Sequence, residues 1–85
     1  MTQIVETVTA TSLAELRRRR DAVTHADLVE LRVDGVTDLD VAGALAGRTR
    51  PVIFTCRASW EGGRFEGDEG QRQRLYAQAV AHGAE

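Results

Sequence analysis

Residues 26–34, with the sequence ADLVELRVD, decide the fold class of this chain. Hydrophobic and charged side chains alternate along the segment, and a period of two residues is that of a β-strand. One face of this strand carries valine and leucine, whereas the other carries Glu30, Arg32 and Asp34. The segment therefore predicts a strand that is buried on one face and charged on the other.

Two further strand patterns flank this segment. QIVETVTA, residues 3–10, precedes it, and PVIFTC, residues 51–56, follows it. The three predicted strands begin about 23 residues apart, which is the spacing of βα units.

Helical patterns occupy the intervals between the predicted strands. Residues 12–23 predict a helix that begins with a capping box of Ser12 and Glu15. Residues 37–47 predict a short helix that is capped by Thr37. A third helix opens at Asp68. The inner faces are predicted to contain Leu13, Leu16 and Val23 in the first helix, and Leu75, Tyr76, Ala79 and Val80 in the third.

Strands that are joined through helices run parallel. In an open doubly wound sheet the central strands are apolar on both faces, and residues 26–34 do not fit that pattern. A charged face fits the lumen of a barrel. We predict an α/β chain that forms the first three βα units of a (β/α)8 TIM barrel. Eight units need about 250 residues, so we expect residues 1–85 to be an incomplete, N-terminal part of a single barrel domain.

Composition excludes several classes of function. The 85 residues are 42% hydrophobic and 28% charged, without an apolar run long enough for a membrane span, so we expect a cytoplasmic protein. A net charge of −2 argues against nucleic-acid binding, and the four arginines at 17–20 are interpreted as a solvated helix surface. The single Cys56 is interpreted as a buried structural thiol.

The chain contains eleven basic residues, and all of them are arginine. Because arginine stays protonated, no side chain of this sequence can form a Schiff base. We therefore expect the 85-residue chain alone to be inactive in any reaction that requires an imine.

The candidates for a site are charged residues on the second predicted strand and at the end of the third. Glu30 and Arg32 share a face, so their charges can partly compensate each other; they form either a polar substrate site or an ion pair without a catalytic role. Asp34 is interpreted as a cap of the following turn. Arg57 ends the third strand and could bind a carboxylate or hydroxyl groups, or else pair with a glutamate of the next loop.

The loop after Arg57 is polar and rich in glycine. Glu61 precedes Gly62 and Gly63, which allow a tight turn that could bring its carboxylate over the barrel mouth. The loop lacks the patterns of phosphate-binding loops. His25 and His82 fall near the starts of strands, away from the expected site.

Three linked segments carry a resemblance to a known family. ADLVELRVD, PVIFTCR and EGGRFEG, in this order and spacing, resemble the N-terminal part of type I 3-dehydroquinate dehydratase, the Schiff-base lyase of the shikimate pathway. The resemblance implies conversion of 3-dehydroquinate to 3-dehydroshikimate without a metal or organic cofactor, and a homodimer for the full-length enzyme.

The resemblance also implies roles for four residues. Glu30, Arg32 and Arg57 would bind the hydroxyl and carboxylate region of the substrate, and Glu61 would help to orient the catalytic histidine. The imine lysine and the base histidine of the family have no counterpart in this chain. Two alternatives remain: another barrel protein that acts on or binds a small anion, and a non-catalytic βα module whose charged face is a partner interface.

Overall fold

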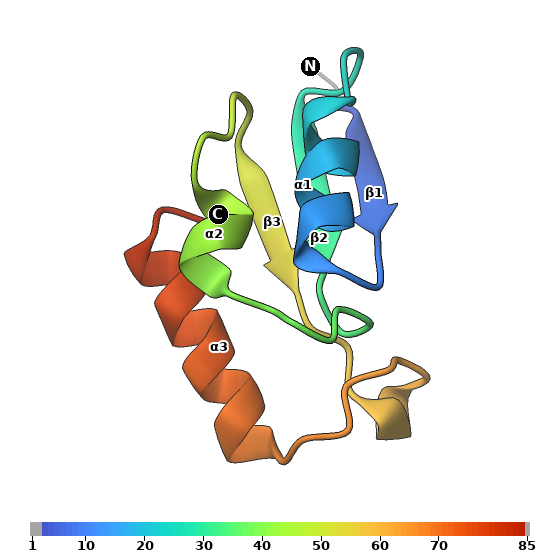
Figure 1. The fold of residues 1–85 in the computed structure, drawn as a ribbon, viewed down its shortest axis with the longest axis vertical. Coiled ribbons are helices and arrows are strands. Elements are labelled where there is room, and N and C mark those ends of the chain that lie inside the picture. Colours follow the sequence, from blue (N-terminus) through green and yellow to red (C-terminus); the bar gives the residue numbers. More distant parts are fainter. Residues whose placement is uncertain (1–2, 85) are drawn as a thin grey trace.

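The fold consists of three parallel βα units (Figure 1). The computed structural model describes residues 3–84. Its elements are, in order, β1 (Val5–Thr9), α1 (Leu13–Asp21), β2 (Leu28–Arg32), α2 (Val41–Leu45), β3 (Val52–Thr55), the 3₁₀ turn η1 (Ser59–Glu61) and α3 (Glu69–Ala81). Both strand pairs are parallel, so the predicted α/β class is confirmed.

The sheet is buried on one face only. Val29, Leu31 and Val33 are at most 2% exposed, and they pack with residues of all three helices in one hydrophobic core. The opposite face carries Glu30 in register with Thr7 on β1 and Ile53 on β3. The strand order is β1–β2–β3, without the reversal of a doubly wound sheet. This arrangement is that of a partial (β/α)8 barrel with helices on its outer side.

The predicted helix starts are confirmed for α1 and α3. At α3, Asp68 accepts a hydrogen bond from the Gln71 N–H at 2.8 Å and the Gln71 side chain accepts one from the Asp68 N–H at 2.9 Å, which completes a capping box. At α1 the predicted capping box is only half formed: the Ser12 hydroxyl accepts from the Glu15 N–H, but the Glu15 carboxylate accepts from the Thr11 N–H instead of the Ser12 N–H.

Two helix predictions were wrong. The residue that precedes α2 is Asp40, not Thr37, because the Thr37 hydroxyl donates to the Thr11 carbonyl oxygen at 3.1 Å and Thr37 belongs to the connecting loop. Val80 of α3 is 66% exposed although it was predicted to be on the inner face. The buried stripe of this helix is narrow, since only Ala79 is fully buried in it.

The interpretation of residues 17–20 as solvated is wrong for Arg20. Its side chain is 3% exposed, and its Nη1 atom donates to the carbonyl oxygens of Ala44 and Ala46 at 2.7 and 2.9 Å. The last carbonyls of a helix lack partners within that helix, so Arg20 satisfies the end of α2. An arginine thus connects α1 to α2 inside the helical layer.

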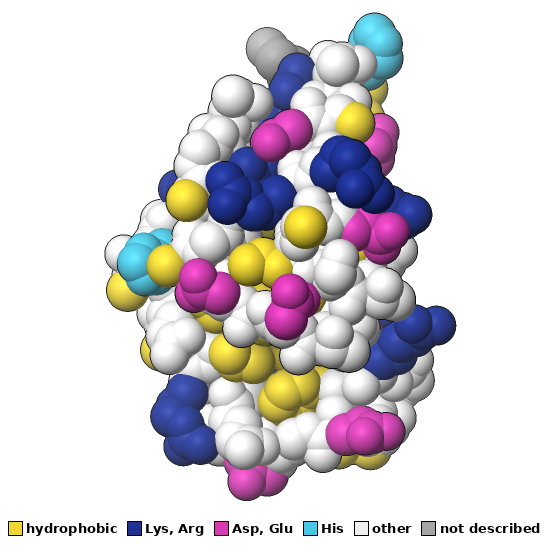
Figure 2. All heavy atoms as spheres, in the orientation of Figure 1, with side chains coloured by type: hydrophobic (Ala, Val, Ile, Leu, Met, Phe, Trp, Pro, Cys, Tyr) yellow, Lys and Arg dark blue, Asp and Glu magenta, His cyan; other side chains and the backbone are white. Residues whose placement is uncertain are grey.

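The surface over the helices carries charges of both signs. Figure 2 shows arginine and acidic side chains interspersed on this face, with small hydrophobic patches between them. Within residues 3–84, no helix has the length and hydrophobicity that crossing a membrane requires.

Candidate functional site

Glu30 lies in the middle of the open face of the sheet. The Thr7 hydroxyl of β1 donates to its Oε1 atom at 2.7 Å, and the Thr55 hydroxyl of β3 donates to its Oε2 atom at 2.8 Å. Each carboxylate oxygen is therefore held by a different neighbouring strand. A carboxylate has about four acceptor positions, so Glu30 retains the capacity to bind a further donor.

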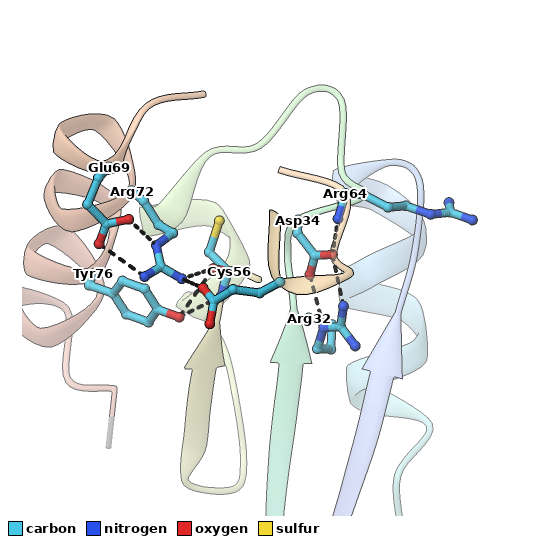
Figure 3. Close-up of polar contacts among 8 residues, drawn as sticks. Arg32, Asp34, Cys56, Arg64, Glu69, Arg72 and Tyr76 are labelled. Atoms are coloured by element: carbon cyan, nitrogen blue, oxygen red, sulfur yellow. Dashed lines mark hydrogen bonds and ion pairs between the residues drawn. The ribbon is translucent and has the colours of Figure 1, made fainter. Parts of the chain in front are cut away.

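Arg32 lies on the same face, but it forms no ion pair with Glu30. Its Nε and Nη2 atoms donate to the two carboxylate oxygens of Asp34 at 3.0 and 2.9 Å (Figure 3). This hydrogen-bonded pair raises the pKa of Arg32, and the charge of Glu30 is a smaller contribution in the same direction. The predicted compensation between Glu30 and Arg32 is thus largely replaced by a pair with Asp34, which presents both oxygens to the planar guanidinium.

Asp34 connects β2 to the loop that follows β3. Its side chain is 3% exposed, and Oδ2 also accepts the backbone N–H of Arg64 at 2.9 Å. Burial raises the pKa of this carboxyl group, but the hydrogen bonds from Arg32 and Arg64 outweigh burial and leave the pKa below its ordinary value. The interpretation of Asp34 as a cap of its own turn missed this contact, which spans 30 residues. In Figure 3 the Arg64 side chain extends away from the carboxylate.

Arg57 follows the buried Cys56 at the carboxyl end of β3. Its side chain is exposed, and within residues 3–84 its guanidinium forms no hydrogen bond or ion pair, so the alternative pairing with Glu61 or Glu66 is not found. An unpaired guanidinium at this end of the sheet can bind an anion or hydroxyl groups.

Glu61 ends the turn η1 and points to α3. Its Oε1 atom accepts a hydrogen bond from Nη1 of Arg72 at 3.0 Å, and its side chain is 50% exposed. Arg72 thus holds this carboxylate beside α3, and its placement over the mouth of the complete barrel stays a prediction. Arg72 was not identified from the sequence, although its spacing from Glu69 is that of a helical ion pair.

The two positions after Glu61 require glycine for different structural reasons. Gly62 has a φ of 88°, which lies in the left-handed region. Gly63 approaches the backbone of Arg57 so closely that an added Cβ would collide with the Arg57 carbonyl group. The N–H of Gly63 donates to the Ala58 carbonyl oxygen at 2.9 Å and closes the turn.

Tyr76 and Arg72 hold the carboxyl end of β3. The N–H of Cys56 donates to the Tyr76 hydroxyl at 2.8 Å, and Nη1 of Arg72 donates to the Cys56 carbonyl oxygen at 3.2 Å. Burial raises the pKa of the Cys56 thiol to about 11, so the thiol stays protonated near neutral pH. This supports the interpretation of Cys56 as structural.

A cleft of about 410 Å³ lies at the carboxyl ends of β1 and β2. Arg19, Arg32, Asp34 and Arg64 contribute to its wall, together with Thr9 and neighbouring residues. Glu30, Arg57 and Glu61 do not line it, so the candidate residues are not enclosed in one cleft: Glu30 lies at the middle of the sheet face, and Arg57 and Glu61 lie beyond the carboxyl end of β3. Figure 1 shows η1 beyond the arrowheads of the strands, at the same end.

The remaining polar candidates lie elsewhere. His25 is in the connection before β2 and His82 follows α3, which agrees with their predicted distance from the carboxyl ends of the strands. In the described part of the chain, no three side chains of the metal-binding types are grouped together.

Comparison with known proteins identifies the family. Residues 4–85 match the model of type I 3-dehydroquinase. The chain belongs to the type I 3-dehydroquinase family. The match covers the N-terminal region of longer relatives.

The similar proteins come from distant organisms. A bifunctional 3-dehydroquinate dehydratase/shikimate dehydrogenase of Arabidopsis thaliana is 39% identical over 64 aligned positions, and the match covers 71% of this chain and 11% of the relative. The 3-dehydroquinate dehydratase of Desulfotalea psychrophila is 39% identical over 59 residues, or 69% of this chain and 26% of the relative. The 3-dehydroquinate dehydratase of Methanosarcina barkeri is 36% identical over 70 aligned positions, and the match covers 74% of this chain and 29% of the relative. The chain thus spans less than a third of the length of these relatives.

Proposed function

We propose that this chain forms the N-terminal, substrate-binding part of a (β/α)8 enzyme that dehydrates 3-dehydroquinate to 3-dehydroshikimate. The fold and the family membership support the lyase reaction, and the open face of the sheet would line the lumen of the barrel. In this proposal Glu30, Arg32 and Arg57 bind substrate, and Glu61 helps to orient the catalytic histidine.

The position of Glu30 is the observation that carries the proposal. Hydroxyl groups of Thr7 and Thr55 hold its two oxygens from both sides, so the carboxylate is oriented before a ligand arrives. A fixed acceptor that retains free lone pairs suits the hydroxyl groups of a polyhydroxylated ring. These two hydrogen bonds therefore distinguish Glu30 from a glutamate whose side chain is free in solvent.

Arg57 supplies a complementary donor. Its guanidinium is exposed and, among residues 3–84, unpaired, so binding a carboxylate or a hydroxyl group there breaks no existing ion pair. Arg32 is different, because Asp34 already occupies its Nε and one Nη atom. Arg32 therefore presents only its remaining N–H groups to a ligand.

The covalent step requires a side chain that this chain does not contain. No lysine is present among the 85 residues, so the imine-forming amine would come from a later part of the barrel. The chain's own residues bind the ring and set its orientation.

A chimaeric enzyme tests this proposal. Residues 1–85 replace the matching segment of the 3-dehydroquinate dehydratase of Desulfotalea psychrophila, and we call this protein the completed barrel. We expect it to convert 3-dehydroquinate. Glu30→Gln and Arg57→Ala should each lower kcat/KM by about 30- to 1000-fold, which corresponds to roughly 2–4 kcal/mol of transition-state stabilisation.

Glu66→Gln is the matched control. Glu66 lies in the same loop as Glu61, is exposed, and should leave kcat/KM within about twofold of the unsubstituted protein. A completed barrel that is folded by circular dichroism but does not turn over would contradict the proposal. So would a loss for Glu66→Gln as large as that for Glu30→Gln.

A further inference from the structure

Arg72 of α3 joins three parts of the chain. Its Nε and Nη2 atoms donate to the two carboxylate oxygens of Glu69 at 2.9 and 3.0 Å, on the same helix. Its Nη1 atom donates to the Cys56 carbonyl oxygen at 3.2 Å and to Glu61 at 3.0 Å. The helix, the end of β3 and the η1 turn therefore meet at one guanidinium (Figure 3).

The surroundings restrict the guanidinium to this position. Its central carbon lies 6.0 Å from the centre of the Trp60 ring and 5.9 Å from that of Tyr76, distances at which a cation is attracted to an aromatic face. The side chain is 20% exposed. The bidentate pair with Glu69 orients the planar group, so that the remaining nitrogen points to the strand end and to Glu61.

The short turn that carries Glu61 does not by itself fix the position of the Glu61 carboxylate. The turn η1 contains three residues, and the Glu61 side chain is half exposed. Within residues 3–84, Arg72 supplies the only hydrogen bond and ion pair found for this carboxylate. Without that contact the side chain would be free to change rotamer, since an exposed glutamate loses little by doing so.

We infer that Arg72 is a positioning residue, which places the Glu61 carboxylate by fixing the η1 turn to the end of β3. This inference rests on the role proposed for Glu61 above. Arg72 touches no substrate in this scheme and acts only through Glu61 and the backbone of Cys56.

Hydrogen exchange of the completed barrel tests the placement independently of activity. In Arg72→Ala, amide exchange in the peptide 57–67 should be about tenfold faster, because the turn loses its tie to α3. The peptide that covers β2 should be unchanged. Arg74→Ala is the matched control, since Arg74 lies on the same helix, is exposed, and should leave exchange of the loop unaltered. Unchanged exchange in Arg72→Ala, or a loop that is unprotected in the unsubstituted completed barrel, would overturn the inference.

Kinetics of the completed barrel test whether Arg72 acts through Glu61. Arg72→Ala should lower kcat about tenfold and leave KM within about twofold. Combined with Glu61→Gln, it should add nothing to the loss that Glu61→Gln causes alone, because both changes remove the same positioned carboxylate. Losses that multiply would show that Arg72 acts independently of Glu61 and would refute the inference. A silent Glu61→Gln would instead refute the role proposed for Glu61, so the two failures are distinguishable.

Discussion

Removal of the Asp34 carboxylate is expected to weaken the fold strongly, in spite of its small size. Asp34→Ala deletes the acceptor of two hydrogen bonds from Arg32 and of one from the Arg64 N–H. The Asp34 side chain is 3% exposed, whereas that of Arg32 is 24% exposed. The substitution therefore leaves a largely buried arginine and a loop N–H without their acceptor.

The structure sets the magnitude of this effect. Removing one member of a buried ion pair costs about 3–5 kcal/mol, and partial exposure of Arg32 moves the value to the lower end of that range. We expect the free energy of unfolding to fall by about 3 kcal/mol at pH 7. Asp21→Ala is the control, because the Asp21 side chain is 55% exposed and its partner Arg20 keeps its hydrogen bonds to the carbonyl oxygens of Ala44 and Ala46 after the change. Its loss should be below about 1 kcal/mol.

The contribution of Asp34 depends on pH in a defined direction. The pKa of this carboxyl group is lower in the folded chain than in the unfolded chain, because the hydrogen bonds from Arg32 and Arg64 outweigh its burial. Its stabilising effect is therefore fully present above the unfolded-state pKa of about 3.9, and it is lost as the pH falls through the lower folded-state pKa. The difference between the original protein and Asp34→Ala should be constant from about pH 7 to pH 5 and shrink below about pH 4.

Urea unfolding of the completed barrel, followed by circular dichroism, measures these differences. If the slope of the free energy of unfolding against urea concentration is the same in each variant, the shift of the midpoint reports a change in stability. Equal losses for Asp34→Ala and Asp21→Ala would refute the reasoning, because burial of the carboxylate would then not distinguish the two changes. A difference that persists undiminished well below pH 3 would refute the electrostatic part.

Two other predictions follow from the loop and from the open sheet. Gly63→Ala should destabilise the completed barrel by about 2 kcal/mol in urea unfolding. The added Cβ would collide with the Arg57 carbonyl group and break the Gly63–Ala58 and Phe65–Arg57 hydrogen bonds. A loss below about 0.5 kcal/mol would contradict this clash. The 85-residue chain by itself should be marginally stable, bind a hydrophobic dye and self-associate, because β1 and β3 have unpaired edges and Ile4 and Val5 are 59% and 46% exposed. Sedimentation and urea unfolding check this, and a monodisperse monomer with a sharp transition would contradict it.

Local patterns in the sequence were sufficient for the architecture. The alternation along residues 26–34 identified which face of β2 is buried, and the structure confirms it with Val29 and Leu31 at 1% and 0% exposure. The start of α3 at Asp68 was predicted from the sequence, and the structure shows Asp68 there as the first residue of a capping box with Gln71. These features are predictable because the period of a strand and the cap of a helix depend on residues within about four positions of each other.

The partners of the charged side chains were decided by tertiary structure. Asp34 contacts the Arg64 N–H 30 residues away, and Arg72 contacts Glu61 and Cys56 at separations of 11 and 16 residues. Arg20 became buried because the carbonyl groups at the end of α2, 24 and 26 residues later, lie within its reach. A guanidinium has five donors on a long flexible side chain, so its sequence neighbours do not determine which acceptors it meets. Only the packing of α1, α2 and α3 against the sheet brings those acceptors close enough to choose among them.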